Sequence, residues 1–164
     1  MSDSDAKKDK LHQKLTKARL QLRTLLTGLS QEQWQEPVYG EGQDWTVRDM
    51  VAHLVDAEYG LTRQIERICQ GSSGIPEDFD LAAWNKKAVA RMADKSPQEL
   101  LQTMAQNRVK LLEVLDSIEE ADWQKSGRHP SMAILTVEQY FKTIASHEAN
   151  HTWEIAQAVG FVDE

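Results

Sequence analysis

The sequence has little cysteine, proline or glycine: one, four and eight residues in 164. The single cysteine, Cys69, excludes an internal disulfide and a metal site built from paired cysteines, and a lone thiol fits a reducing compartment. Because proline and glycine interrupt helices, their scarcity allows long ones. No apolar run approaches the roughly 20 residues of a membrane-spanning helix. The first ten residues are polar and charged, unlike a secretory signal, so we expect a cytoplasmic protein.

The chain also has fewer basic residues than acidic ones. The chain has 19 Lys and Arg against 26 Asp and Glu, a formal net charge of -7. Proteins that bind nucleic acid or membrane surfaces usually present a basic face, so we expect neither partner. The overall composition is that of an ordinary globular protein, and the length fits a single domain over residues 1–164.

Helix start and stop signals divide the chain into helices. Serine or threonine caps, apolar residues at helical spacing and terminal glycines predict four long helices and one short helix, with loops between them. The long helices are expected over 5–27, 46–70, 96–117 and 136–159, the short one over 81–93, and loops over 38–44, 71–78 and 127–133. No segment alternates with period two over a useful length, so we predict no strands. The predicted fold class is all-α: a four-helix bundle with an extra short helix between the second and third long helices.

Two histidines near the C-terminus are four residues apart. His147 and His151 therefore point the same way from a helix, to within about 40°. Both fall on the apolar stripe of the last helix, where the pattern calls for apolar residues. Burial of two imidazoles is costly unless each finds a partner. One metal ion would satisfy both rings, and an i, i+4 pair is a common source of two nitrogen ligands.

His53 is the expected third ligand. It lies on the flank of the apolar stripe of the second long helix, beside Met50 and Ala57. If the second and last long helices are neighbours, modest offsets bring it level with the C-terminal pair. Three neutral imidazoles suit one divalent metal ion, zinc or nickel first, with iron, cobalt and manganese as further candidates. Such a set leaves coordination positions open, as a catalytic metal requires.

The string from His147 to His151, HEANH, also matches two other metal motifs. The first is the HExxH of zinc metalloproteases, which usually take a third ligand from well downstream; none of the thirteen residues after His151 is a histidine. The second is the ExxH half of a di-iron bundle site, whose second copy is absent here. We therefore favour a mononuclear site. Glu148 lies about 100° around the helix from His147, and we expect it to face solvent.

Other polar residues have weaker patterns. His12 lies among lysine and glutamine and His129 precedes Pro130, so both are expected at the surface. Cys69 is about 24 Å along the same helix from His53, so it cannot share that metal and is expected to pack in the interior.

Two acidic residues are spaced to support the histidines. Asp56 lies three residues after His53, and Glu154 lies three after His151. Either could orient an imidazole through its second ring nitrogen, or could equally be a surface charge. The segment 71–93 could cover the metal and shape a substrate pocket.

Together these features resemble the DinB/YfiT-like superfamily of small metal-binding four-helix bundles. The likeness rests on the stretch 44–54, DWTVRDMVAHL, and on the HEANH string over 147–151. The order of elements also matches: a first helix, a Leu-Ser-x-Glu-Gln-Trp turn, a tryptophan-containing loop, a helix with one histidine and a final helix with HxxxH. It covers nearly the whole chain. All three metal positions of the family are histidine here: His53, His147 and His151.

The resemblance implies an enzyme with a small-molecule substrate, and it adds a homodimer as a further expectation. One such activity is metal-dependent hydrolysis. The other is the transfer of mycothiol, bacillithiol or a related low-molecular-weight thiol to an electrophile. Bound metal would then activate a thiol or water as the nucleophile. Two alternatives stay open: a non-catalytic protein that binds a metal or small ligand in a stress response, and a bundle whose histidines are structural.

Overall fold

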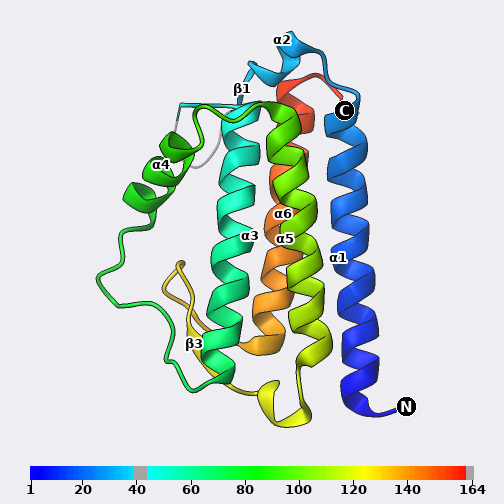
Figure 1. The fold of residues 1–164 in the computed structure, drawn as a ribbon, viewed down its shortest axis with the longest axis vertical. Helices are drawn as coiled ribbons and strands as arrows, with labels where there is room; N and C mark the ends of the chain where they lie inside the picture. Colours follow the sequence, from blue (N-terminus) through cyan, green and yellow to red (C-terminus); the bar gives the residue numbers. More distant parts are fainter. Residues whose placement is uncertain (39–43, 162–164) are drawn as a thin grey trace.

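Four long helices lie side by side along the molecule (Figure 1). They are α1 (Asp3–Thr27), α3 (Val47–Cys69), α5 (Pro97–Ser117) and α6 (Val137–Ala158). The shorter helices are α2 (Gln31–Trp34), α4 (Leu81–Arg91) and the 3-10 helix η1 (Glu120–Asp122). The computed structural model describes residues 1–38 and 44–161, so most of the loop expected over 38–44 lies outside the described residues. The prediction of a four-helix bundle with an extra short helix is confirmed.

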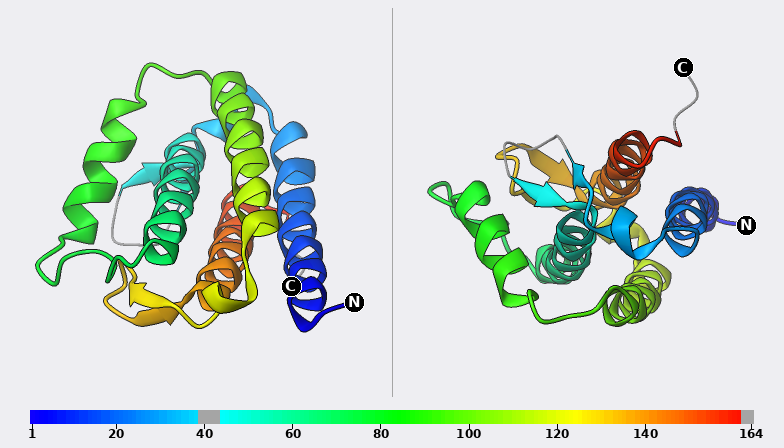
Figure 2. Two further views of the ribbon diagram at one scale, coloured as in Figure 1. Left: turned by 60° about the horizontal axis from the view of Figure 1, so that its bottom comes forward. Right: turned by 90° about the horizontal axis from the view of Figure 1, so that it is seen from above.

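The helices do not alternate in direction along the chain. α1 and α6 run one way, and α3 and α5 run the other (Figure 1). The long connection over 70–96 carries α4 back along the outside of α3, which lets α5 start at the same end as α3 (Figure 2). α3 packs against both α5 and α6, and α1 packs mainly against α6. The result places α3 and α6, the two helices with the predicted metal ligands, in direct contact.

Capping boxes begin the long helices. The side chains of Ser2, Thr46, Ser96 and Thr136 each accept a hydrogen bond from the backbone N–H of the third residue of the helix, and the side chain of that third residue accepts one from the backbone N–H of the cap. This pairing satisfies two backbone N–H groups that a helix start leaves open. The predicted starts of α3, α5 and α6 are thereby confirmed, while α1 begins earlier than expected because Ser2 is its cap.

The prediction that the chain has no strands is wrong. Two antiparallel ribbons are present, β1 (Pro37–Val38) with β2 (Trp45–Thr46) and β3 (Ser126–Arg128) with β4 (Ile134–Thr136). β3 and the turn after it also replace part of the loop expected over 127–133. Strands of two or three residues are too short to show a period-two pattern, which is why the sequence did not reveal them.

Each ribbon ends on the residue that caps a histidine-bearing helix. β2 ends at Thr46, the cap of α3, and β4 ends at Thr136, the cap of α6. The first helical N–H groups complete the connection, Val47 to the carbonyl of Glu36 and Val137 to that of Lys125, both at 2.9 Å. Both ribbons lie against the α3 and α6 side of the bundle (Figure 2). They therefore fix where these two helices begin.

The core consists of two apolar clusters with buried charges between them along the helices. One cluster includes Phe141 and Trp123, the other Met50 and Trp34. On each long helix a charged residue separates the two sets: Arg19, Glu58, Arg108 and Glu148. Among the described residues, no helix is both long and apolar enough to cross a membrane.

The turn between β3 and β4 holds His129, and the prediction that this residue is exposed is wrong. The half-buried ring packs on Tyr140 with 5.4 Å between centroids, and its Nδ1 accepts a hydrogen bond from the backbone N–H of Ser131 at 3.0 Å. Burial lowers the pKa of His129 below its ordinary value of 6.5. Burial also raises the pKa of Tyr140 to about 12, so its hydroxyl stays a donor to the carbonyl of Arg128.

We expect His129 to make the fold less stable in mild acid. Because folding lowers its pKa, the unfolded chain binds the proton more tightly, and stability is lost as pH falls through the ordinary value. In His129→Gln the free energy of unfolding should therefore fall less between about pH 8 and pH 5 than in the parent. Urea unfolding at each pH measures the free energy of unfolding of both proteins. An equal loss of stability in the two would show that His129 does not cause the acid sensitivity.

Candidate metal centre

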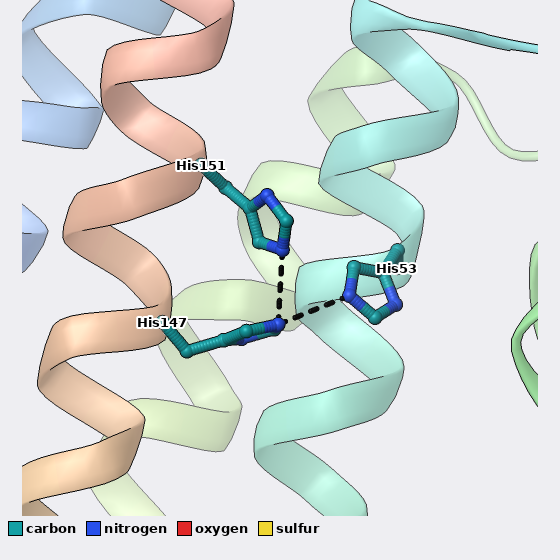
Figure 3. Close-up of side chains that lie close together, drawn as sticks. All are labelled: His53, His147 and His151. Carbon is teal, nitrogen blue, oxygen red and sulfur yellow. Dashed lines mark hydrogen bonds between the residues drawn. The ribbon is translucent and has the colours of Figure 1, made fainter. Parts of the chain in front are cut away.

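The three predicted histidines meet between α3 and α6 (Figure 3). His53 projects from α3, and His147 and His151 project from α6. The Nε2 atom of His147 lies 3.2 Å from Nε2 of His53 and 2.9 Å from Nε2 of His151. His53 and His151 are buried, and His147 is half-buried. The expectation that the second and last long helices are neighbours is confirmed.

The geometry of this cluster fits a set of metal ligands. All three ligand nitrogens lie within 4.8 Å of one another. Two imidazole nitrogens at about 2.0–2.1 Å from one zinc are about 3.3 Å apart in tetrahedral geometry. The rings meet edge to face, at 78° to 83°, so they do not stack on one another. Among residues 1–38 and 44–161, no other group of histidine, cysteine or acidic side chains is arranged to hold an ion.

Two side chains support the histidine rings. Glu154 Oε2 lies 2.8 Å from Nδ1 of His151, one helical turn away. This carboxylate keeps a proton on Nδ1 and leaves the Nε2 lone pair toward the centre. The indole of Trp45, the first residue of β2, packs on the ring of His53 with 5.1 Å between centroids. The position of Glu154 was predicted, whereas the contact of Trp45 was not.

Asp56, the other acidic candidate, connects α4 to α3. Its carboxylate accepts a hydrogen bond from the indole N–H of Trp84 at 3.0 Å and lies 3.7 Å from the guanidinium of Arg91. Arg91 in turn lies over the Trp84 ring. These contacts hold the segment predicted to cover the metal against the helix of His53.

Glu148 is buried, and the prediction that it faces solvent is wrong. It is 3% exposed. Oε1 accepts a hydrogen bond from Nε of Arg19 at 2.9 Å, and Oε2 accepts one from Arg108 at 3.1 Å. Because guanidinium groups hold both oxygens, Glu148 is not placed to act as the general base of an HExxH protease.

A second carboxylate, Glu58, completes a network of buried charges. It accepts from Arg108 Nε at 2.7 Å and pairs with Arg19. The two arginines also donate to backbone carbonyls, of Leu15 and Met104. The network joins all four long helices. It lies next to the histidine-bearing segment of α6, because Glu148 directly follows His147 in the chain.

A sequence signal for this network existed. Glu58 lies four residues after Leu54 and three before Leu61, so it occupies the apolar stripe of α3. Arg108 has the same relation to Met104 and Leu111 on α5. A charged residue within an apolar stripe predicts a buried charge that needs a partner. The identity of the partners required the fold.

Two other candidates lie away from the centre, as predicted. His12 is half-buried, with its Nε2 2.7 Å from a carboxylate oxygen of Asp116. Cys69 packs at the end of α3 against the core cluster that includes Phe141, and burial raises the pKa of its thiol. Neither residue belongs to the histidine cluster.

The sequence matches the family model of the DinB superfamily over residues 14–155. None of the curated proteins matches it. Solved structures with the same fold include YfiT from Bacillus subtilis, described as a probable metal-dependent hydrolase with an unusual four-helix bundle topology. That pair has a TM-score of 0.73 at 21% identity over 99% of this chain and 91% of YfiT.

Two further structures are similar at lower identity. The colibactin self-resistance protein ClbS, solved with double-stranded DNA, has a TM-score of 0.75 at 16% identity over 95% of this chain and 97% of ClbS. A mycothiol-dependent maleylpyruvate isomerase has a TM-score of 0.71 at 17% identity, over 88% of this chain and 60% of the isomerase. At these identities the similarity establishes a shared fold.

Proposed function

This chain belongs to the DinB superfamily, and we propose that it is a metal-dependent enzyme that uses His53, His147 and His151 as the ligands of one divalent ion. The observation that carries the proposal is the convergence of three Nε2 atoms from two helices. The reaction we propose is activation of a thiol or water for attack on a small electrophile, as in a thiol transferase or a hydrolase. Zinc and nickel are the ions we favour.

The chain's own residues supply ligands and orientation. His53 and the pair on α6 would hold the ion and leave positions open for a thiol or water, whose pKa a divalent ion lowers toward neutrality. Glu154 fixes the tautomer of His151, and Trp45 restricts the ring of His53. Burial of His53 and His151, which are 3% and 1% exposed, keeps these two rings out of bulk water.

The structural neighbours favour this class of reaction. One is described as a probable metal-dependent hydrolase and another is mycothiol-dependent. These descriptions support a small-molecule substrate and a low-molecular-weight thiol as a candidate partner. Because a DNA-bound protein shares the fold, our expectation that nucleic acid is not a partner stays a prediction.

The proposal is tested with protein purified without a His tag. Elemental analysis should find zinc or nickel, and a chelator should remove it. Thiol transfer and hydrolysis are then followed over a panel of thiols and electrophiles, before and after metal is restored. We expect turnover only in the metal-loaded protein. If metal binds but no substrate in the panel turns over, the enzyme proposal is contradicted and a non-catalytic metal- or ligand-binding protein is favoured.

Removal of the carboxylate beside His151 should weaken metal binding. In Glu154→Ala we expect affinity for Zn²⁺ to fall by about 10–100-fold, the usual effect of losing an outer partner of a ligating histidine. Glu138→Ala is a matched control on the same helix: the two glutamate side chains are 23% and 24% exposed, and Glu138 pairs with Lys142 rather than with a histidine. Competition with a chromophoric chelator measures both variants. Equal affinities would show that Glu154 does not orient the ligand.

A further inference from the structure

A cleft lies on another side of the bundle from the histidine cluster. α1 and α5 make few contacts with each other, and a cleft of about 420 Å³ opens between them. Its size falls within the roughly 300–1,000 Å³ of small-molecule sites. None of its lining residues comes from α3 or α6, the helices of the histidine cluster. The proposed function therefore does not account for this cleft.

The walls of the cleft are mostly apolar. They are formed by Leu22, Leu26, Leu101, Met104 and Ala105. Such a surface favours the apolar part of a ligand, because that part leaves water on binding. A stable protein interface takes roughly 20–30 residues on each side, many more than line this cleft. The size and chemistry thus favour a small molecule over a second protein chain.

The charged residues at the cleft are arginines. Arg19 and Arg108 at its base are paired with Glu58 and Glu148, so their charges are already balanced. Arg23 is exposed at the cleft and, within the described part of the chain, forms no ion pair. Among the residues that the structure describes, no acidic side chain lines the cleft. An anionic group would therefore meet an available cation at Arg23.

We propose that this cleft binds a small amphipathic carboxylate. The apolar chain would lie between α1 and α5, and the carboxylate would pair with Arg23. This is an inference about a site separate from the metal centre, and it does not depend on the proposed enzymatic activity.

The test uses octanoate and its uncharged counterpart 1-octanol, titrated calorimetrically into chelator-treated protein so that no metal can bind the carboxylate. We expect octanoate to bind. Ala105 is exposed on α5, and Ala105→Trp should lower the affinity by at least about 10-fold because the indole fills the cleft. Gln106→Trp, an exposed neighbour outside the cleft, should have no effect. Arg23→Gln should weaken octanoate by about 2- to 5-fold, the size of an exposed ion pair, and leave octanol unchanged.

A charge control shows whether Arg23 acts through the cleft or only through the net charge of the protein. Arg67→Gln removes an equal charge from an exposed position outside the cleft and should leave both affinities unchanged. Failure of octanoate to bind at millimolar concentration would overturn the proposal, as would equal binding by Ala105→Trp. A lower oligomeric mass of Ala105→Trp, with no competition from octanoate, would show that a second copy of the chain occupies the cleft and would also overturn it.

Discussion

Substitution of any one of His53, His147 and His151 by alanine should lower the affinity for Zn²⁺ by more than about 100-fold. Loss of an outer partner alone costs about 10–100-fold, and these changes remove a ligand atom itself. The three Nε2 atoms form one cluster, so the three variants should lose similar amounts of Zn²⁺ affinity. Competition with a chromophoric chelator gives the affinities. His12→Ala, which removes a histidine from the pair with Asp116, should bind Zn²⁺ as the parent does.

A thermal measurement distinguishes lost ligation from lost packing. An ion that binds only the folded state stabilises it by about 2.7 kcal/mol at a concentration 100 times the dissociation constant. The parent and His12→Ala should therefore melt at a higher temperature with Zn²⁺, while the three alanine variants should show little change. If His147→Ala keeps both its metal content and the thermal shift, the site is not built as proposed.

The sequence specifies the fold through signals that are local in the chain. Ser96 with Glu99 and Thr136 with Gln139 predict helix starts because a capping box needs only residues within one turn. The apolar stripes predict which faces meet. The two short ribbons were missed because β2 and β4 each pair with another segment of the chain, and strands of two or three residues show no alternation.

The histidine cluster could also be predicted in part, because the positions of its residues on apolar stripes are local signals. His147 and His151 are marked by their positions on an apolar stripe, and His53 by the flank of another. Glu148 was misassigned because its position about 100° around α6 from His147 was taken to face solvent. In the bundle α6 contacts both α1 and α3, so the side of α6 away from His53 is also interior. Whether a side chain between two contact faces is buried or exposed cannot be decided from the pattern of its own helix alone.

Arg108→Ala should destabilise the protein by about 3–5 kcal/mol, the cost of breaking a buried ion pair by removing one partner. The side chain of Arg108 is 9% exposed and those of Glu58 and Glu148 are 5% and 4% exposed. Burial opposes the charge of Arg108, but the two carboxylates outweigh it and raise the pKa of the guanidinium above its ordinary value. Urea unfolding of the metal-free protein measures the loss. Arg67→Ala, at an exposed position, should change stability by less than about 0.5 kcal/mol.

The expected loss in Arg108→Ala comes mainly from the two carboxylates that it leaves without their full set of partners. Replacing the whole network with apolar residues, Arg19→Met, Glu58→Leu, Arg108→Met and Glu148→Leu, leaves no buried charge without a partner. This quadruple variant should therefore be more stable than Arg108→Ala, because apolar replacement of a buried network is often neutral or stabilising. If it is the less stable of the two, the network contributes net stabilisation that apolar packing cannot replace. Because both variants remove Arg108 but only the single variant leaves Glu58 and Glu148 buried, the comparison measures the cost of carboxylates that lack their full set of partners.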